Sequence, residues 1–153
     1  MIDGHNLIPK LGLDLQDPDD ETKLIILLQG FCQYKQTKVE VYFDGAMLGG
    51  TPQRKSGSVS IHFIRKGRSA DAAIETRLLK LGRSARNWSV VSSDHRVQAA
   101  AHEVHARVIS SEEFARQVVT AQVERSVQSK AESALSPAEV ADWLELFNGE
   151  KKD

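Results

Sequence analysis

The sequence predicts a doubly wound α/β fold, in which a mainly parallel five-stranded sheet has helices on both faces. Short runs rich in β-branched and aromatic residues alternate with longer segments whose apolar residues have helical spacing, and Gly or Pro residues separate them. The chain has 153 residues, of which 41% are apolar, so we expect one domain with a single core. In such a fold, ligands bind beyond the carboxyl ends of the parallel strands.

Five short apolar segments are the predicted strands. They are residues 1–2, 39–43, 59–64, 88–91 and 107–109. The second is rich in β-branched and aromatic residues, and the third alternates apolar and polar residues. The first is only a stub before Asp3, and a predicted loop through Gly12 follows it. No helical pattern lies between the second and third strands, so the third is either antiparallel or reached through a tight loop.

Helical segments follow four of these strands, and each begins at a capping signal. Asp17 and Pro18 begin the first helix, and Ser69 begins the second. Residues 92–94 open the third helix, and a capping box at 110–113 begins the fourth, which we expect to end near residue 128.

The C-terminal part of the chain is predicted to extend the same domain. We expect residues 1–128 to form the domain proper and residues 129–153 to be a linker followed by an amphipathic helix. A second capping box at 136–139 begins that helix. Its apolar face consists of Val140, Trp143, Leu144 and Phe147. We expect this face to pack on the domain, and docking of a partner protein is the alternative.

Composition excludes several classes of protein. No apolar run approaches the roughly 20 residues that cross a bilayer, so we expect no membrane partner. Cys32 is the single cysteine, which excludes an intrachain disulfide and a cysteine-based zinc site. The first residues do not have the pattern of a secretory signal, and we therefore expect a cytoplasmic protein.

Positive charge is concentrated in the middle of the chain, although the net charge is −1. Residues 54–107 contain eleven Lys and Arg against four Asp and Glu, a balance of +7, whereas each flanking region has a balance of −4. Such a zone fits a polyanionic substrate, and chance clumping of solvated charges is the alternative. The candidate phosphate contacts are Arg54, Lys55, Arg65, Lys66, Arg68 and Arg96.

Four aspartates, which are Asp3, Asp44, Asp71 and Asp94, fall at or just after the ends of four predicted strands. Because parallel strands share one carboxyl edge, we expect these side chains to meet there. Crowded carboxylates repel one another unless cations neutralise them, and Mg²⁺ or Mn²⁺ prefers such oxygen ligands. The alternative to a metal site is that Asp71 and Asp94 are ordinary helix caps or first-turn acids.

A divalent ion held there could polarise a phosphodiester and lower the pKa of a bound water. Asn6 lies three residues after Asp3 and could orient a water or the substrate, and Glu75 lies one helical turn beyond Asp71. Pairing of Glu75 with Arg77 or a Lys is equally compatible with the sequence. We expect Ser92 and Ser93 to cap the helix at Asp94, and Ser93 is also a candidate substrate contact.

Five motifs in order resemble the YacP-like branch of the NYN domains, which belong to the PIN-like nuclease fold. The motifs are Ile2-Asp3-Gly4-His5-Asn6-Leu7-Ile8, Val41-Tyr42-Phe43-Asp44-Gly45, Ser69-Ala70-Asp71, Val90-Val91-Ser92-Ser93-Asp94 and Val108-Ile109-Ser110-Ser111-Glu112-Glu113-Phe114. The resemblance covers roughly residues 1–116. It implies a PIN-like doubly wound sheet, a divalent-metal site and endoribonuclease activity on single-stranded or loosely structured RNA.

The resemblance also implies residue roles: Asp3, Asp71 and Asp94 would bind the metal, with Asn6 beside them and Asp44 close by. The chain departs from the family pattern in two places. Many relatives have a second acid where this chain has Ala72, and most have more apolar residues before the first Asp, so either the first strand is clipped or the recorded start lies downstream of the natural one.

We therefore predict a metal-dependent endoribonuclease that cleaves RNA. One alternative is a binding module of the same fold that associates with RNA or the ribosome without turnover. The other is a phosphatase or nucleotidase, which the absence of an Asp-x-Asp pair at the strand ends disfavours.

Overall fold

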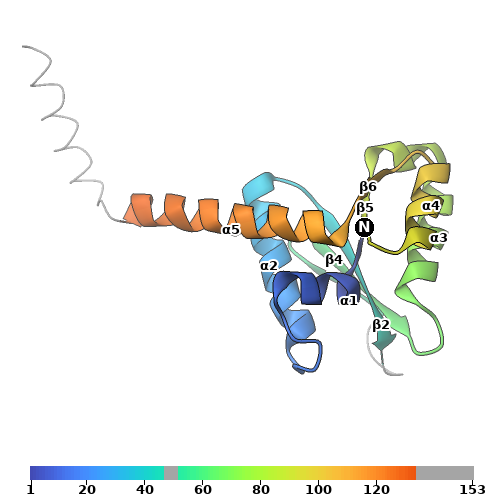
Figure 1. Cartoon of the computed structure of the whole chain (residues 1–153), viewed down its shortest axis with the longest axis horizontal. Helices are drawn as coiled ribbons and strands as arrows, with labels where there is room; N and C mark the ends of the chain where they lie inside the picture. Colours follow the sequence, from blue (N-terminus) through green and yellow to red (C-terminus); the bar gives the residue numbers. More distant parts are fainter. Residues whose placement is uncertain (47–51, 134–153) are drawn as a thin grey trace, which may run out of the picture.

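A six-stranded sheet organises the chain in the computed structural model, which describes residues 1–46 and 52–133 (Figure 1). The strands are β1 (Ile2–Asp3), β2 (Val39–Ala46), β3 (Gln53–Ser56), β4 (Val59–Arg65), β5 (Ser89–Val91) and β6 (Arg107–Ile109). Their order is β3-β4-β2-β1-β5-β6, and all pairs are parallel except β3 with β4. The predicted mainly parallel α/β fold is confirmed.

The sheet contains one strand more than the sequence predicts. The extra strand, β3, pairs with β4 in an antiparallel hairpin, whereas β4 itself runs parallel to β2. Residues 53–56 are polar and mostly exposed, as is usual for a short edge strand, so their pattern does not indicate a strand. The third predicted strand, β4, is thus parallel to β2, and β3 is the antiparallel strand at the sheet edge.

Helices cover both faces of the sheet. They are α1 (Gly4–Leu7), α2 (Asp20–Lys35), α3 (Ala70–Leu81), α4 (His95–Glu103) and α5 (Ser111–Ser133), with short 3-10 helices η1 (Ile8–Leu11) and η2 (Gly82–Asn87). Val41 and Phe43 of β2 pack with α2 and α5, and Tyr42 packs with α3 and α4 on the other face. Figure 1 shows α3 and α4 side by side, with α5 extending away from the sheet.

The chain immediately after β1 is helical, where the sequence predicted a loop. Gly4 begins α1 directly behind Asp3, and a Cβ atom at this position would lie 2.3 Å from Cε1 of Phe43. Glycine therefore allows α1 to press against β2 at the carboxyl end of β1. This contact holds the first residues of the chain at the carboxyl edge of the sheet, where ligands are expected to bind.

Helix boundaries differ from the predictions at two places. Helix α2 begins at Asp20, with Asp19 as its N-cap residue, and the predicted cap Asp17 instead accepts a hydrogen bond from the Asp19 N–H (2.9 Å) and pairs with Lys23. Helix α5 continues to Ser133, so residues 129–133 are helical rather than part of the predicted linker. The predicted C-terminal helix that begins at residue 136 lies outside the described residues.

Candidate active site

Asp3 and Asp71 meet at the carboxyl edge of the sheet. Asp3 ends β1, the strand that lies between β2 and β5, and Asp71 is in the first turn of α3. Ser69 caps this helix by accepting a hydrogen bond from the Ala72 N–H at 3.1 Å. The cap fixes the first turn of α3, which carries the Asp71 carboxylate toward the end of β1.

The contact between these two carboxyl groups changes their chemistry. The pKa of Asp3 is raised to about 7, first by burial and then by a hydrogen bond with Asp71 and the charges of Asp71 and Asp44, against the lowering effect of the Asn6 backbone. Apart from this carboxyl pairing, the buried Oδ1 atom of Asp71 has no hydrogen-bond partner in the described part of the chain. Two crowded carboxylates and an unpaired oxygen form a donor set that suits a hard divalent cation.

The third predicted metal ligand, Asp94, is placed differently. Its Oδ1 atom accepts hydrogen bonds from the backbone N–H groups of Arg96 (2.8 Å) and Val97 (3.4 Å), so Asp94 is the N-cap of α4. Within residues 1–46 and 52–133, no group of three or more His, Cys, Asp or Glu side chains is arranged to hold a metal ion. The role of Asp94 as a ligand therefore stays a prediction.

Glu75 is paired with a cation from the neighbouring helix. The Nε atom of Arg96 lies 2.8 Å from Oε1 of Glu75, and Nη2 donates to Oε2 at 3.1 Å. The sequence suggested Arg77 or a Lys as its structural partner, and Arg77 instead pairs with Glu40. Because Arg96 is engaged in this pair, it is less available to the phosphate contact predicted for it.

His5 connects Asp44 to α2. Its Nδ1 atom lies 2.7 Å from Oδ1 of Asp44, and its Nε2 atom lies 2.9 Å from Oε1 of Glu21. Hydrogen bonding to Glu21 and to Asp44 raises the pKa of His5 to about 9 despite partial burial, so the ring is doubly protonated at neutral pH and donates both N–H groups. Asp44 is thus held beside β1 by a cation that sequence reasoning did not assign to it.

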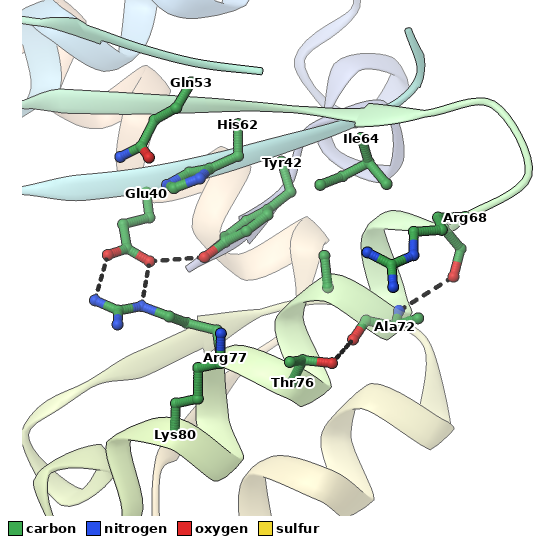
Figure 2. A pocket seen from close by; sticks show the side chains of 12 residues that line it. Glu40, Tyr42, Gln53, His62, Ile64, Arg68, Ala72, Thr76, Arg77 and Lys80 are labelled. Carbon is green, nitrogen blue, oxygen red and sulfur yellow. Dashed lines mark hydrogen bonds and ion pairs between the residues drawn. The ribbon is translucent and has the colours of Figure 1, made fainter.

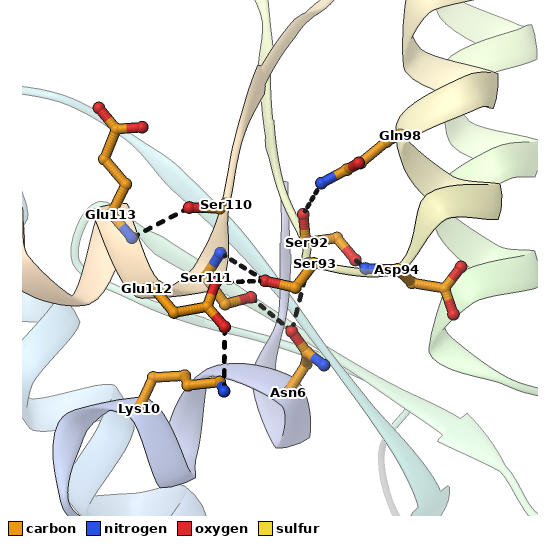
Figure 3. A network of polar contacts seen from close by, with 10 residues as sticks. All are labelled: Asn6, Lys10, Ser92, Ser93, Asp94, Gln98, Ser110, Ser111, Glu112 and Glu113. Carbon is orange, nitrogen blue, oxygen red and sulfur yellow. Dashed lines mark hydrogen bonds and ion pairs between the residues drawn. The ribbon is translucent and has the colours of Figure 1, made fainter.

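Asn6 is held by a polar network that joins α1 to the start of α5 (Figure 3). Its Oδ1 atom accepts hydrogen bonds from the Ser111 hydroxyl and, at 3.4 Å, from the Ser93 N–H. The Ser93 hydroxyl accepts from the Ser111 N–H (3.1 Å) and donates to Glu112 (2.7 Å), which pairs with Lys10 (2.9 Å). Ser93, a predicted substrate contact, is therefore committed to this network.

The buried side chain of Ser92 supports the same edge. Its Oγ atom accepts a hydrogen bond from the Asp94 N–H at 3.1 Å, and its carbonyl oxygen accepts from Gln98 at 2.9 Å. The N-cap of α4 is Asp94 itself, so the prediction that Ser92 and Ser93 cap this helix is wrong. No sequence pattern indicates the parts played by Lys10, Ser111 and Glu112. Ser111 and Glu112 lie inside the predicted capping box at 110–113, and their contacts to the first turn become visible only when β1 and β6 share a sheet.

The remaining predicted substrate contacts form two exposed basic groups. Arg54 and Lys55 lie on β3, where the Arg54 guanidinium is 6.0 Å from the centre of the Phe63 ring. Arg65, Lys66 and Arg68 form the turn between β4 and α3, closed by a hydrogen bond from the Arg68 N–H to the Arg65 carbonyl (3.0 Å) and by Gly67 at a φ of 101°. This turn leads directly into the helix that carries Asp71.

A doubly wound sheet with acidic side chains at its carboxyl edge is the architecture of the PIN-like nuclease class. The sequence matches the profile of the YacP-like NYN domain over residues 1–146, and the chain belongs to this family. NYN domains are nuclease-like proteins. The family predicted from the five motifs is thus confirmed.

Two crystal structures from Bacillus subtilis resemble the chain. Rae1 (YacP) has 26% sequence identity and a TM-score of 0.67, over 99% of this chain and 91% of that one. A single-substitution variant of Rae1 has 24% identity and a TM-score of 0.71, over 89% of this chain and 83% of the variant. No curated protein matches the sequence. Among the described helices, none has the length and apolar character needed to span a membrane.

Proposed function

We propose that the protein is a metal-dependent endoribonuclease that hydrolyses phosphodiester bonds in single-stranded or loosely structured RNA. The observation that carries this proposal is the contact between Asp3 and Asp71, with one buried oxygen left unpaired, beside an exposed basic turn. Uncompensated carboxylates are costly at such a place unless a cation joins them. Membership of a nuclease-like family supports the same conclusion.

The proposed division of labour follows from the positions of the side chains. Asp3 and Asp71 would hold Mg²⁺ or Mn²⁺, with Asp94 as the further candidate ligand. Such an ion supplies Lewis-acid activation of the phosphodiester and of water. Asn6 has its oxygen committed to Ser93 and Ser111, so its amide nitrogen is the group left to donate a hydrogen bond to substrate or water. The basic turn at 65–68 would bind the RNA backbone.

A cleavage assay with labelled RNA tests this proposal. The wild-type protein should cut RNA when Mg²⁺ or Mn²⁺ is added and should stop when the ion is chelated. Asp71→Asn should lose at least about a hundredfold in rate, as expected when a group that holds a catalytic ion is removed, while RNA binding persists. Asp19→Asn, at an exposed aspartate that makes no side-chain cap, is the matched control and should cleave normally.

A binding module of the same fold is the second candidate, and specific observations favour it. Asp94 is engaged as a helix cap, and position 72, where many relatives have an acid, is alanine. Such a protein would bind RNA or the ribosome without cutting. RNA binding with no cleavage under any divalent ion would support this candidate and contradict the nuclease.

A further inference from the structure

A groove between α3 and β4 lies outside the carboxylate site. Its volume is about 510 Å³, within the range of sites for small organic ligands. Helix α3 packs on β1, β2 and α4, and the groove opens where the sheet continues past α3 to β4. Figure 2 shows Tyr42, His62 and Ile64 projecting from the sheet toward Thr76 and Lys80 of α3.

The floor of the groove contains a pair of stacked rings, of which Tyr42 is buried (3% exposed) and His62 is half-buried, so His62 is the ring that a ligand can reach. The rings of Tyr42 and His62 stack with centroids 4.6 Å apart and an angle of 12° between their planes. The Tyr42 hydroxyl donates to Glu40 (2.8 Å), and Arg77 holds Glu40 through two nitrogens at 3.0 and 3.3 Å. Because this network fixes Tyr42, and Tyr42 supports the His62 ring, His62 is held in place before any ligand arrives. Contact with a ring of this kind is a common way of holding a nucleobase.

The floor also contains a polar atom without a hydrogen-bond partner among the described residues. The Nε2 atom of His62 is buried and has no hydrogen-bond partner in the described part of the chain. Burial lowers the pKa of His62, so its ring is neutral at neutral pH and offers both a donor and an acceptor nitrogen. Gln53, an exposed amide on β3, adds further hydrogen-bonding groups at the side of the groove.

The charge of the groove selects an anion. Glu40 and Arg77 neutralise each other, which leaves Arg68 and Lys80 as the other charged residues that line it. Both side chains are exposed, and neither has an acidic partner within ion-pair distance among the residues the structure describes. Arg68 precedes the capped N-terminus of α3, where the helix dipole also favours negative charge. A base-sized floor beside two unpaired cations matches a nucleotide with its phosphate.

The groove adjoins the carboxylate site along α3. Ala72, the residue after Asp71, lines the groove, and an acid at this position would place negative charge on its wall. A second hollow shares Gln53, His62, Arg68 and Lys80 with the groove and extends to Arg65 in the basic turn. The two hollows therefore form a continuous path from the start of α3 across the outer face of β4.

We infer that this groove binds one nucleotide of the RNA strand, with its base against the His62 ring and its phosphate at Arg68 and Lys80. The assignment to an RNA strand rests on the proposed function, whereas the recognition chemistry is that of any nucleoside monophosphate. The groove then acts as a subsite that positions the strand beside Asp71 and gives the protein a preference for the base it holds.

Titration of the full chain with nucleoside monophosphates tests the groove without any cleavage. Wild-type protein should bind at least one of the four common monophosphates more tightly than ribose 5-phosphate, which lacks the base. Thr76→Phe, which fills the groove from an exposed position, and Lys80→Gln, which removes a cation, should each weaken this binding by about tenfold. Thr22→Phe and Lys38→Gln, at exposed positions on or next to other elements, are the matched controls and should bind as wild type does.

RNA cleavage forms the second arm. Thr76→Phe should raise KM for RNA by about tenfold with little change in kcat, because the groove binds the strand and does no chemistry. Asp71→Asn should lose cleavage and keep monophosphate binding. A raised KM without measurable binding of free monophosphates would show that the groove accepts the nucleotide only as part of a strand, which still supports the inference.

Two outcomes separate this inference from the proposed function. If no RNA is cut but Thr76→Phe and Lys80→Gln abolish monophosphate binding, the nuclease proposal fails and the nucleotide site stands. If RNA is cut and Thr76→Phe changes neither KM nor monophosphate binding, the inference about the groove is overturned and the nuclease proposal stands.

Discussion

Ser111 donates its hydroxyl proton to the side-chain oxygen of Asn6, which lies 105 positions earlier in the chain. The Ser93 N–H, which can only donate, bonds to the same oxygen and fixes the orientation of the amide. The first turn of the molecule and the start of α5 are therefore joined directly at the edge of the candidate site.

Ser111→Ala should destabilise the protein by about 1–2 kcal/mol, because the hydroxyl is fully buried and its removal leaves Asn6 with only the longer bond from Ser93. Urea unfolding followed by circular dichroism measures this. If cleavage occurs, its rate should fall as well, since Asn6 gains freedom. Ser126→Ala, at an exposed position on the same helix, should change stability by no more than about 0.5 kcal/mol. Equal effects of the two substitutions would contradict the proposed importance of the contact.

Asp71→Asn should stabilise the metal-free protein near neutral pH by about 1 kcal/mol, because it removes a like charge from beside Asp3. The raised pKa of Asp3 means that its contribution to stability is present below its ordinary pKa and is lost as pH rises toward about 7. In thermal unfolding with chelator present, the melting temperature of Asp71→Asn should therefore fall less over this pH range than that of the wild type. Mn²⁺ should raise the melting temperature of the wild type but not of Asp71→Asn, and a similar rise in both would place the ion elsewhere.

The ion pairs of His5 predict a loss of stability at alkaline pH. Its pKa is raised from 6.5 to about 9, so its stabilising contribution is complete below pH 6.5 and is lost as pH rises through 9. The difference in unfolding free energy between wild type and His5→Asn should therefore shrink over this window when measured with chelator present. His102→Asn, an exposed histidine on α4, serves as the control. A difference that stays constant across the window would exclude a charged His5.

Gly4→Ala should destabilise the protein by about 1–3 kcal/mol, because the new methyl group would meet the fully buried ring of Phe43. Gly30→Ala is a matched control: its Cβ would lie 2.4 Å from Nη1 of Arg125, the end of a flexible and exposed side chain whose hydrogen bond to Gln33 (3.2 Å) is also exposed. Helix propensity should then make Gly30→Ala neutral or stabilising by up to about 1 kcal/mol. Chemical denaturation compares the two variants, and a harmless Gly4→Ala would show that α1 does not press on β2.

Salt dependence of RNA binding should distinguish free arginines from paired ones. Arg65→Gln should make the negative slope of log affinity against log salt shallower by about 0.7, as expected for one lost phosphate contact on a single strand. Arg96→Gln should lower it less, because Glu75 already neutralises Arg96. Fluorescence anisotropy over a series of salt concentrations measures both slopes. A larger effect at Arg96 would mean that RNA displaces Glu75 from its pair.

Local patterns predicted the parallel sheet and the capped start of α3, because β-branched runs and the Ser69 cap are encoded within a few residues. They also predicted that acids follow several strands, and Asp3 and Asp71 come together once α3 packs on β1 and β2. The edge strand β3 escaped prediction because its residues are polar and bury little surface.

Contacts between distant elements could not be predicted from sequence. The partners of His5, Glu75 and Asn6 come from α2, α4 and α5, and no local pattern specifies which charges those helices bring. Asp94 illustrates the same limit, since one aspartate at a strand end satisfies the pattern for a metal ligand and for a helix cap equally well. In the structure the Oδ1 atom of Asp94 caps α4, and metal binding by Asp94 stays a prediction.

The short length of β1 has a consequence for motion. Two residues hydrogen-bonded between β2 and β5 have no rigidity of their own, so the Asp3 carboxylate stays in place only while both neighbours remain closed around it. Local unfolding of β2 or β5 would therefore also free the Asp3 side chain to move. The rates of hydrogen exchange at the amides of Val41 and Val91 would then measure how often this edge of the sheet opens.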